Sequence, residues 1–189
     1  MALTKPAPGH WRYEDLLDLP DDGRRYEIIE RKLYEMPAPS WAHATVVMNM
    51  IALLLPVVRA IGGLIRTAPL DVFFPGADPV QPDIIVILPD GGARPSKRGV
   101  EGRPDLVVEV LSPSNRDHDL LTKRALYAQA GVREYWLIDP DARRFDILGL
   151  DRNALHLVQS VTGGDSVRSP LLAAVEIPAA GIDAADADA

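Results

Sequence analysis

One acidic residue interrupts a strongly apolar stretch of the chain. In the segment DLVVEVL (105–111), the run of Val and Leu around Glu109 predicts a strand covered on both faces. Side chains alternate along a strand, so Glu109 shares its face with Val107 and Leu111. A carboxylate buried there must be ion-paired, hydrogen-bonded or metal-bound, because burying it alone is very costly. A structural ion pair and a functional role explain Glu109 equally well at this point.

A second carboxylate, Asp83, opens the preceding predicted strand, in the segment QPDIIVIL (81–88). Consecutive strands joined by a loop without a helix are normally antiparallel. Asp83 at the start of one strand would then lie near Glu109, close to the end of the next. Two convergent carboxylates on rigid strands suit Mg²⁺ or Mn²⁺, hard cations that keep several waters. Taken alone, Asp83 is also explained as a turn residue after proline, so the metal-site hypothesis rests on the pair.

Lys123 is the candidate cation beside these acids. It falls in a predicted helix from about Arg116 to Ala130, on the same side as Leu120 and Tyr127 at about 100° per residue. A lysine that leans toward an apolar side either extends its ammonium to the surface or meets a carboxylate. Because this helix follows the Glu109 strand directly, a reach back to the two acids is feasible.

The elements that must position these side chains can be read from periodicity and from turn residues. Two short strands (25–30 and 32–36) predict an N-terminal hairpin after a short helix from Tyr13 to Leu19. Ser40 is a plausible N-cap of a long helix that ends at Gly62-Gly63, with Pro56 as a kink. The other expected elements are strands at 64–74, 83–88 and 105–111, a loop from Pro89 to Pro104, the helix closed by Gly131, and strands at 134–139, 143–150 and 154–160.

The order of these elements predicts an α/β fold with a mixed central sheet. The strand at 105–111, the following helix and the strand at 134–139 form a β-α-β crossover, which pairs those two strands in parallel. The last two strands extend the sheet as antiparallel additions. The core order is therefore helix, three strands, helix, strand. We expect one domain over residues 11–178, a flexible arm at 1–10 and a disordered acidic tail at 179–189.

Composition limits the classes of function. The chain has no cysteine, which excludes disulfides, thiolate metal sites and a cysteine nucleophile and fits a reducing cytoplasm. The amino terminus lacks the apolar run of a signal peptide. The apolar stretch from Val46 to Ile61 contains Asn49, Pro56 and Arg59, so we interpret it as a buried helix rather than a membrane span.

The net charge of −7 does not indicate a general nucleic-acid binder. Basic residues do gather in the predicted loop, at Arg94, Lys97, Arg98 and Arg103, either as a solvated surface or as a contact to phosphates. The chain lacks a phosphate-cradling glycine loop and a Gly-x-Ser-x-Gly elbow, which disfavours a hydrolase of small phosphate esters. The four histidines lack metal-ligand spacing, so we do not expect zinc.

Several segments, in matching order between Tyr26 and Pro140, resemble the "putative restriction endonuclease" family of the PD-(D/E)XK nuclease superfamily. They are YEIIERKLYEMPAPSWAH, APLDVFF, QPDIIVIL and RPDLVVEVLSPSNRDHDLLTKRALYAQAGVREYWLIDP. The resemblance implies a restriction-endonuclease-like core in the order deduced above. It also implies Asp83 and Glu109 as the acidic pair, and Lys123 as the lysine that this family carries on the following helix.

The chain departs from the superfamily pattern at two places. Leu111 stands where the lysine usually follows the acid on the same strand. The long helix after Ser40 has no acidic residue where the first core helix often supplies a glutamate. Glu27, from the hairpin, could contribute instead, and we rank it above His43 at the start of the long helix. A cross-strand charge and a packed or capping histidine are the structural explanations of these two residues.

The expected function is metal-assisted hydrolysis of nucleic-acid phosphodiester bonds, with DNA as the favoured substrate. Asp83, Glu109 and the backbone carbonyl of Val110 would hold Mg²⁺ or Mn²⁺, and Lys123 would orient the attacking water or stabilise charge on the phosphate. Cutting both strands of a duplex would favour a symmetric homodimer. The alternative is an inactive nuclease fold that serves as a binding or assembly module, which the acidic charge and the missing strand lysine support.

Overall fold

The computed structural model describes residues 9–19, 24–36, 38–112, 116, 118–163, 165–172 and 176–178. The predicted acidic tail at 179–189 lies outside the described residues, as does the predicted arm except for Gly9 and His10.

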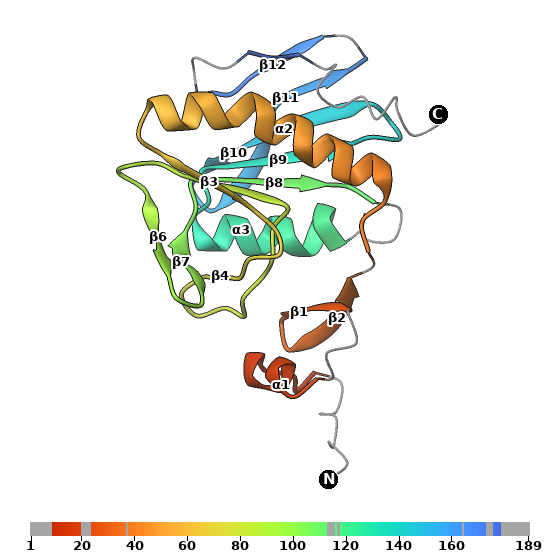
Figure 1. The fold of residues 1–189 in the computed structure, drawn as a ribbon, viewed down its shortest axis with the longest axis vertical. Coiled ribbons are helices and arrows are strands. Elements are labelled where there is room, and N and C mark those ends of the chain that lie inside the picture. Colours follow the sequence, from red (N-terminus) through yellow and green to blue (C-terminus); the bar gives the residue numbers. More distant parts are fainter. Residues whose placement is uncertain are drawn as a thin grey trace.

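A six-stranded mixed sheet forms the centre of the molecule (Figure 1). Across the sheet its strands are β11 (Ala154–Thr162), β10 (Arg144–Asp151), β9 (Glu134–Asp139), β8 (Leu106–Val110), β5 (Ile84–Ile87) and β3 (Leu64–Thr67). Strands β5, β8 and β9 are buried along their whole length, as their continuous apolar sequences predict. The pair β5–β8 is antiparallel and the pair β8–β9 is parallel, which confirms both predicted directions.

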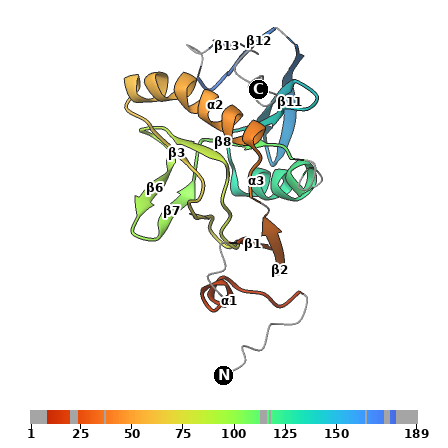
Figure 2. The ribbon, with the colours of Figure 1, turned by 45° about the vertical axis from the view of Figure 1, so that its right-hand side comes forward.

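Helices cover both faces of this sheet (Figures 1 and 2). Helix α2 (Trp41–Ala60) packs on one face through Val46, Met50, Leu54 and Val58, which are spaced four residues apart. On the other face, π-helix η1 (His118–Lys123) continues into α3 (Arg124–Ala130), which buries Tyr127 and Ala128. The order α2, β3, β5, β8, η1–α3, β9 is the predicted core order.

Helix α2 is only partly the buried helix that we expected. It runs without a break through Pro56, and its outer side exposes Trp41 and Met48 to 68% and 66%. An 18-residue window of this 20-residue helix has a mean hydropathy of 1.8, enough by length and composition to cross a membrane. Composition alone therefore does not distinguish a buried helix from a span here. A core helix of a soluble protein meets the same criterion, and one side of α2 does pack on the sheet.

Two segments differ from their predicted structure. The single strand expected at 64–74 is divided into β3 and β4 (Val72–Phe73), which belong to different sheets. Pro69 lies between them and has no N–H to donate to a strand ladder. The loop expected from Pro89 to Pro104 contains a hairpin of β6 (Gly92–Ser96) and β7 (Gly99–Arg103), and β7 also pairs with β4. These three strands form a second, smaller sheet beside the main one.

The predicted N-terminal elements are present. Helix α1 (Tyr13–Leu17) precedes a hairpin of β1 (Arg25–Ile29) and β2 (Lys32–Met36). Figures 1 and 2 place both elements beyond α3, at the end of the molecule away from α2. The hairpin turn is made by Glu30 and Arg31, whose φ angles are +51° and +61°. Two-residue turns of this kind usually contain asparagine or glycine, because other side chains are strained at positive φ.

The helix that follows Glu109 starts as predicted but is not α-helical throughout. Arg116 is already helical, the segment η1 from His118 to Lys123 is π-helical, and α3 is α-helical from Arg124. Its end at Gly131 is as predicted, with a left-handed φ of +81°. Single π-turns are rare and frequently lie at functional sites.

The segment that follows β12 (Ser166–Arg168) and precedes β13 (Glu176–Pro178) is anchored to a buried carboxylate. Glu134, at the start of β9, accepts hydrogen bonds from the indole of Trp136 (2.9 Å), the hydroxyl of Ser169 (2.7 Å) and the backbone N–H of Leu171 (2.6 Å). Glu134 is 3% exposed. It ties the segment after β12 to the central sheet.

We expect Glu134→Leu to lower the free energy of unfolding by about 3 kcal/mol, because three donors lose their acceptor. Urea unfolding followed by tryptophan fluorescence measures this change. The matched control is Glu176→Leu, which removes an exposed carboxylate paired with Arg168 and should cost less than about 1 kcal/mol. Equal stability of the two variants would contradict an anchoring role for Glu134.

Candidate active site

The antiparallel pairing of β5 and β8 brings Asp83 and Glu109 to one place. Ile84 is the register partner of Val108, so Asp83, one residue before β5, lies beside Glu109. Asp83 Oδ2 accepts the backbone N–H of Val110 at 2.8 Å, which fixes the aspartate against the end of β8. The Asp83 side chain is 14% exposed, whereas Glu109 is 2% exposed. The pair therefore has a buried member and a member that solvent reaches.

Lys123 lies directly against these acids. Its ammonium Nζ is 3.1 Å from Glu109 Oε1, 3.4 Å from Glu27 Oε2 and 3.3 Å from Asp119 Oδ1. The residue is 1% exposed, so it does not extend to the surface. One buried ammonium thus connects carboxylates from β1, β8 and η1. The structure brings Asp83, Glu109, Lys123 and Glu27 together.

Further donors fix the orientation of two of these carboxylates. The hydroxyl of Tyr127 donates to Glu109 Oε1 at 2.6 Å, and the backbone N–H of Gln81 donates to Glu27 Oε1 at 2.8 Å. Glu109 Oε1 therefore receives two donors. Within the described residues, Glu109 Oε2 and Asp83 Oδ1 make no hydrogen bond. Each acid keeps one carboxylate oxygen for a further ligand.

His43 extends the cluster on the side of Asp83. It lies in the first turn of α2, where the hydroxyl of Ser40 accepts its backbone N–H and caps the helix. Its Nε2 is 3.0 Å from Asp83 Oδ2, and in the tautomer that carries a proton on Nε2 it donates to that oxygen. We ranked Glu27 above His43, but each of them contacts a member of the predicted pair or its lysine.

The cluster carries more negative than positive charge. Burial raises the pKa of Glu109 well above its usual value. Lys123 lowers that pKa, but Asp119, Asp83 and Glu27 raise it. Burial alone would lower the pKa of Lys123, yet the three carboxylates around its ammonium raise it well above its usual value. Lys123 therefore keeps its proton, but its single positive charge does not offset the burial of Glu109 and the repulsion from the other carboxylates.

Comparison with protein families assigns the chain over most of its length. Residues 13–180 match the model of the Uma2 family, which is described as "Putative restriction endonuclease". The chain belongs to the Uma2 family. This confirms the resemblance identified from the segments between Tyr26 and Pro140. Comparison with curated protein sequences finds no match.

Among solved structures, the fold is similar to the crystal structure of "a putative nuclease belonging to DUF820" from Anabaena variabilis. The TM-score is 0.72 and the sequence identity 22%, over 89% of this chain and 95% of that one. At this identity the likeness shows a shared fold. The Uma2 chain therefore has the nuclease-like α/β architecture that its order of elements predicts.

Two members of the Uma2 cluster were not predicted from the sequence. Asp119 lies four residues before Lys123, a spacing at which helical side chains meet. Tyr127 lies four residues after it and was assigned only to the apolar side. The i, i+4 spacing on both sides of a buried lysine was the available signal. It could not be used without knowing that Lys123 itself is buried.

The basic segment of this Uma2 chain lies on the β6–β7 hairpin rather than in a loop, and its Arg94 and Arg98 side chains are exposed. Arg94 and Arg98 lie at 3.5 Å and 3.3 Å from the carboxylate of Glu101 on the same hairpin. Arg103 donates to the backbone carbonyl of Gly131 at 2.6 Å and so caps the end of α3. Three of the four basic side chains thus have partners within the protein.

Proposed function

We propose that this Uma2 protein is a divalent-metal-dependent endonuclease that hydrolyses phosphodiester bonds of nucleic acids, with DNA as the favoured substrate. One observation carries the proposal: the solvent-reachable Asp83 and the buried Glu109 stand side by side, and a buried ammonium is bonded to Glu109. Membership of a family described as restriction endonuclease supports the same reaction class. We take residues 11–178 as one catalytic domain.

The donor set fits a hard divalent cation. Asp83 and Glu109 each have an oxygen without a hydrogen bond, and the surrounding acids outnumber Lys123. In the described part of the chain, no three His, Asp or Glu side chains form a ready-made ligand group. Mg²⁺ and Mn²⁺ do not need one, because they are bound through one or two carboxylates plus waters and substrate phosphate. Asp83, Glu109 and the Val110 carbonyl would hold the ion.

Each residue then has a distinct task. A bound divalent ion supplies a polarised phosphate and a water of lowered pKa. Lys123 and Tyr127 hold Glu109 Oε1, which would leave Oε2 available to a bound ion. His43 and the N–H of Val110 hold Asp83 Oδ2 in the same way. The Lys123 ammonium also provides positive charge next to the position of the attacked phosphate.

Metal binding should depend on pH in a defined direction. Because the pKa of Glu109 is raised, the ion must displace a proton from the carboxyl group, and its affinity should increase as pH rises toward that pKa. We expect the increase in Tm with Mn²⁺ to be larger at pH 8 than at pH 5.5. Thermal denaturation with and without 1 mM Mn²⁺, compared with Glu109→Gln, measures this. No increase at either pH would contradict a functional metal site.

His43 should strengthen metal binding at the same site because it holds Asp83 in position. We expect His43→Ala to weaken Mn²⁺ binding by about 10- to 100-fold, as is typical when a residue that orients a ligand is removed. Isothermal titration calorimetry gives the affinity, and His156→Ala on the exposed side of β11 is the matched control. Unchanged affinity in His43→Ala would mean that Asp83 needs no support from the histidine.

An inactive nuclease fold that serves as a binding or assembly module is the alternative. The close contacts of Lys123 with three carboxylates and the net charge of −7 favour it. The two functions differ in one experiment: nicking of supercoiled and single-stranded DNA with Mn²⁺, Mg²⁺ or EDTA. Cleavage that requires the metal and is lost in Asp83→Asn supports the endonuclease. Metal binding without cleavage supports the module.

A further inference from the structure

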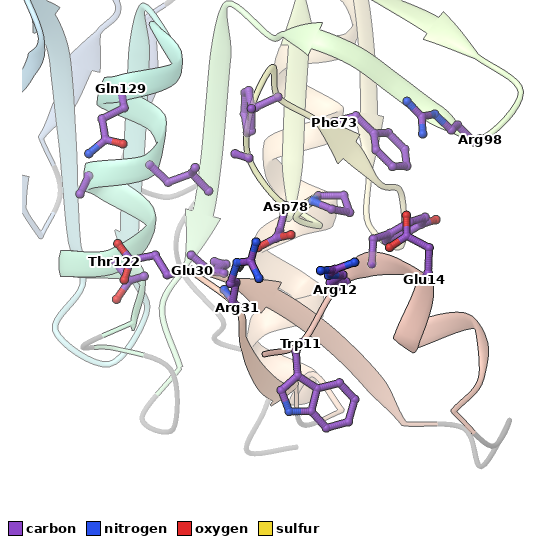
Figure 3. Close-up of a pocket in the computed structure, with 18 residues that line it drawn as sticks. Trp11, Arg12, Glu14, Glu30, Arg31, Phe73, Asp78, Arg98, Thr122 and Gln129 are labelled. Atoms are coloured by element: carbon purple, nitrogen blue, oxygen red, sulfur yellow. Dashed lines mark hydrogen bonds between the residues drawn. The ribbon is translucent and has the colours of Figure 1, made fainter. Parts of the chain in front are cut away.

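A pocket of about 650 Å³ lies beside the proposed active site (Figure 3). Its walls come from five parts of the chain: the start of α1, the β1–β2 turn, β4 with the loop after it, the β6–β7 turn, and the outer side of η1–α3. This volume is in the range of sites that bind small molecules. The residues that carry the argument are Arg12, Arg31, Arg98, Asp78, Glu30 and Glu14.

Two arginines of this pocket have no partner among the residues that the structure describes. Within the described residues, the guanidinium groups of Arg12 and Arg31 make no hydrogen bond or ion pair. Figure 3 shows both near the middle of the pocket, with the carboxylate of Asp78 beside them. A third arginine, Arg98, lies over the ring of Phe73 at 3.9 Å. Guanidinium groups bind phosphate oxygens through paired hydrogen bonds, so the two free ones are suited to a phosphate.

The β1–β2 turn positions one of these arginines at a conformational cost. Glu30 and Arg31 both adopt positive φ, where glycine or asparagine would be less strained. The turn is held from both sides: the N–H of Trp11 donates to the carbonyl of Arg31, and the N–H of Arg31 donates to Asp78. Strained residues that the surroundings enforce are concentrated at functional sites. The strain here supports a functional reason for Arg31 at this point.

The pocket adjoins the proposed active site through both of its inner walls. Thr122, in the pocket wall, immediately precedes Lys123, and Ile29, in the opposite wall, is two residues from Glu27. Hydrogen bonds also join the two places. The hydroxyl of Tyr13 donates to Asp71 at 2.9 Å, and the side chain of Gln81 donates to Asp71 at 2.9 Å. The backbone N–H of Gln81 in turn holds Glu27.

The pocket is not uniformly basic, and this decides which part of a nucleic acid it fits. Its three arginines are matched by Glu14, Glu30 and Asp78. A track for a duplex backbone would gain its affinity from a surplus of positive charge. Free guanidinium groups next to carboxylates instead suit a single nucleotide: arginine binds the phosphate, and a carboxylate accepts from amino groups on the base edge. The base edge is available only when the nucleotide is unpaired.

We therefore propose that this pocket binds one unpaired nucleotide of the substrate strand next to the cleaved bond. Arg12 and Arg31 hold its phosphate, and Asp78 accepts from its base. The proposal rests on the proposed function, because it takes the ligand to be the substrate of the adjacent site. It names single-stranded nucleic acid, or a locally opened duplex, as the substrate form.

Binding is measured with fluorescently labelled 12-nucleotide single-stranded DNA and RNA, and with a blunt duplex of the same sequence. Fluorescence anisotropy gives the affinity, and EDTA in the buffer removes divalent ions and so prevents cleavage. We expect the double variant Arg12→Gln/Arg31→Gln to weaken single-strand binding at least about tenfold. The slope of the logarithm of the binding constant against the logarithm of the salt concentration should become shallower by about 0.7 for each lost phosphate contact. Ala77→Trp, which fills the pocket without changing charge, should weaken it as well. Arg59→Gln, at the exposed end of α2, is the matched control.

Two results would overturn the proposal: single-strand binding by the double variant equal to that of Arg59→Gln, or wild-type protein that binds the duplex as tightly as the single strand. Binding in EDTA is independent of chemistry, so failure of the endonuclease proposal is recognised separately. In that case the wild type would bind the single strand through Arg12 and Arg31 and cleave nothing with any divalent ion. Similar affinities for the DNA and RNA single strands would show that the pocket recognises the phosphate and the base rather than the sugar.

Discussion

Glu109→Gln should reduce metal-dependent DNA cleavage at least about 10²- to 10³-fold, because the variant loses one of two anionic metal ligands. The substitution keeps the shape of the side chain and removes a carboxylate that burial penalises. Tyr127 and Lys123 can still donate to the remaining amide oxygen. The variant should therefore fold as the wild type does. Nicking of supercoiled plasmid in Mn²⁺, with rates from single-turnover time courses, measures the effect.

The matched control is Asp151→Asn, which removes an exposed carboxylate at the far end of β10. It should cleave at the wild-type rate. Equal rates for Glu109→Gln, Asp151→Asn and the wild type would mean that the observed cleavage comes from another site or from a contaminant. Loss in both variants would point to a general effect of surface charge.

Lys123→Met should cause the largest loss of stability, about 3–5 kcal/mol at pH 7, because it leaves buried carboxylates without their counter-charge. Methionine is similar in length, so little packing is lost. Thermal and urea unfolding measure the change. Lys32→Met, on an exposed part of β2, is the matched control and should lie within about 0.5 kcal/mol of the wild type.

The loss in Lys123→Met should depend on pH. Glu109 already has a raised pKa, and removing Lys123 raises it further. A carboxyl group whose folded pKa is raised stabilises the protein relatively more below its unfolded pKa, and this contribution disappears as pH rises through the folded value. The penalty should therefore be smaller at pH 5 than at pH 8. A penalty that is the same at both pH values would show that packing, and not charge, is lost.

Most of the central fold was predictable because the apolar strands have strong local patterns. The continuous Val and Ile runs of β5 and β8, and the glycine after α3, fixed the number and direction of the core elements. The segments whose structure was predicted wrongly depend on partners elsewhere in the chain. Strand β4 has two residues and pairs with β7, whose residues follow it only after the β6 strand, and the β6–β7 hairpin was not predicted because of its glycines and proline.

The candidate site was predictable where a charged residue stands out in an apolar stretch of the sequence. Glu109 stood out because it interrupts an apolar strand, and Asp83 followed from the antiparallel connection. The contacts of Glu27 and His43 depend on how the hairpin and α2 dock on the sheet, which no local pattern records. The roles of all these residues remain predictions that the variants above test.

The π-helical turn η1 ties the position of Lys123 to the length of the chain as well as to its residue type. A π-turn spans one residue more than an α-turn, and each residue of a helix rotates the next side chain by about 100°. Deleting Leu121, which is 70% exposed, would let the segment rewind as an ordinary α-helix. Asp119 and Lys123 would then be spaced i, i+3 in place of i, i+4, which changes where the ammonium lies relative to Glu109. The number of residues in this turn, as well as the residue type at position 123, thus determines where the Lys123 ammonium lies.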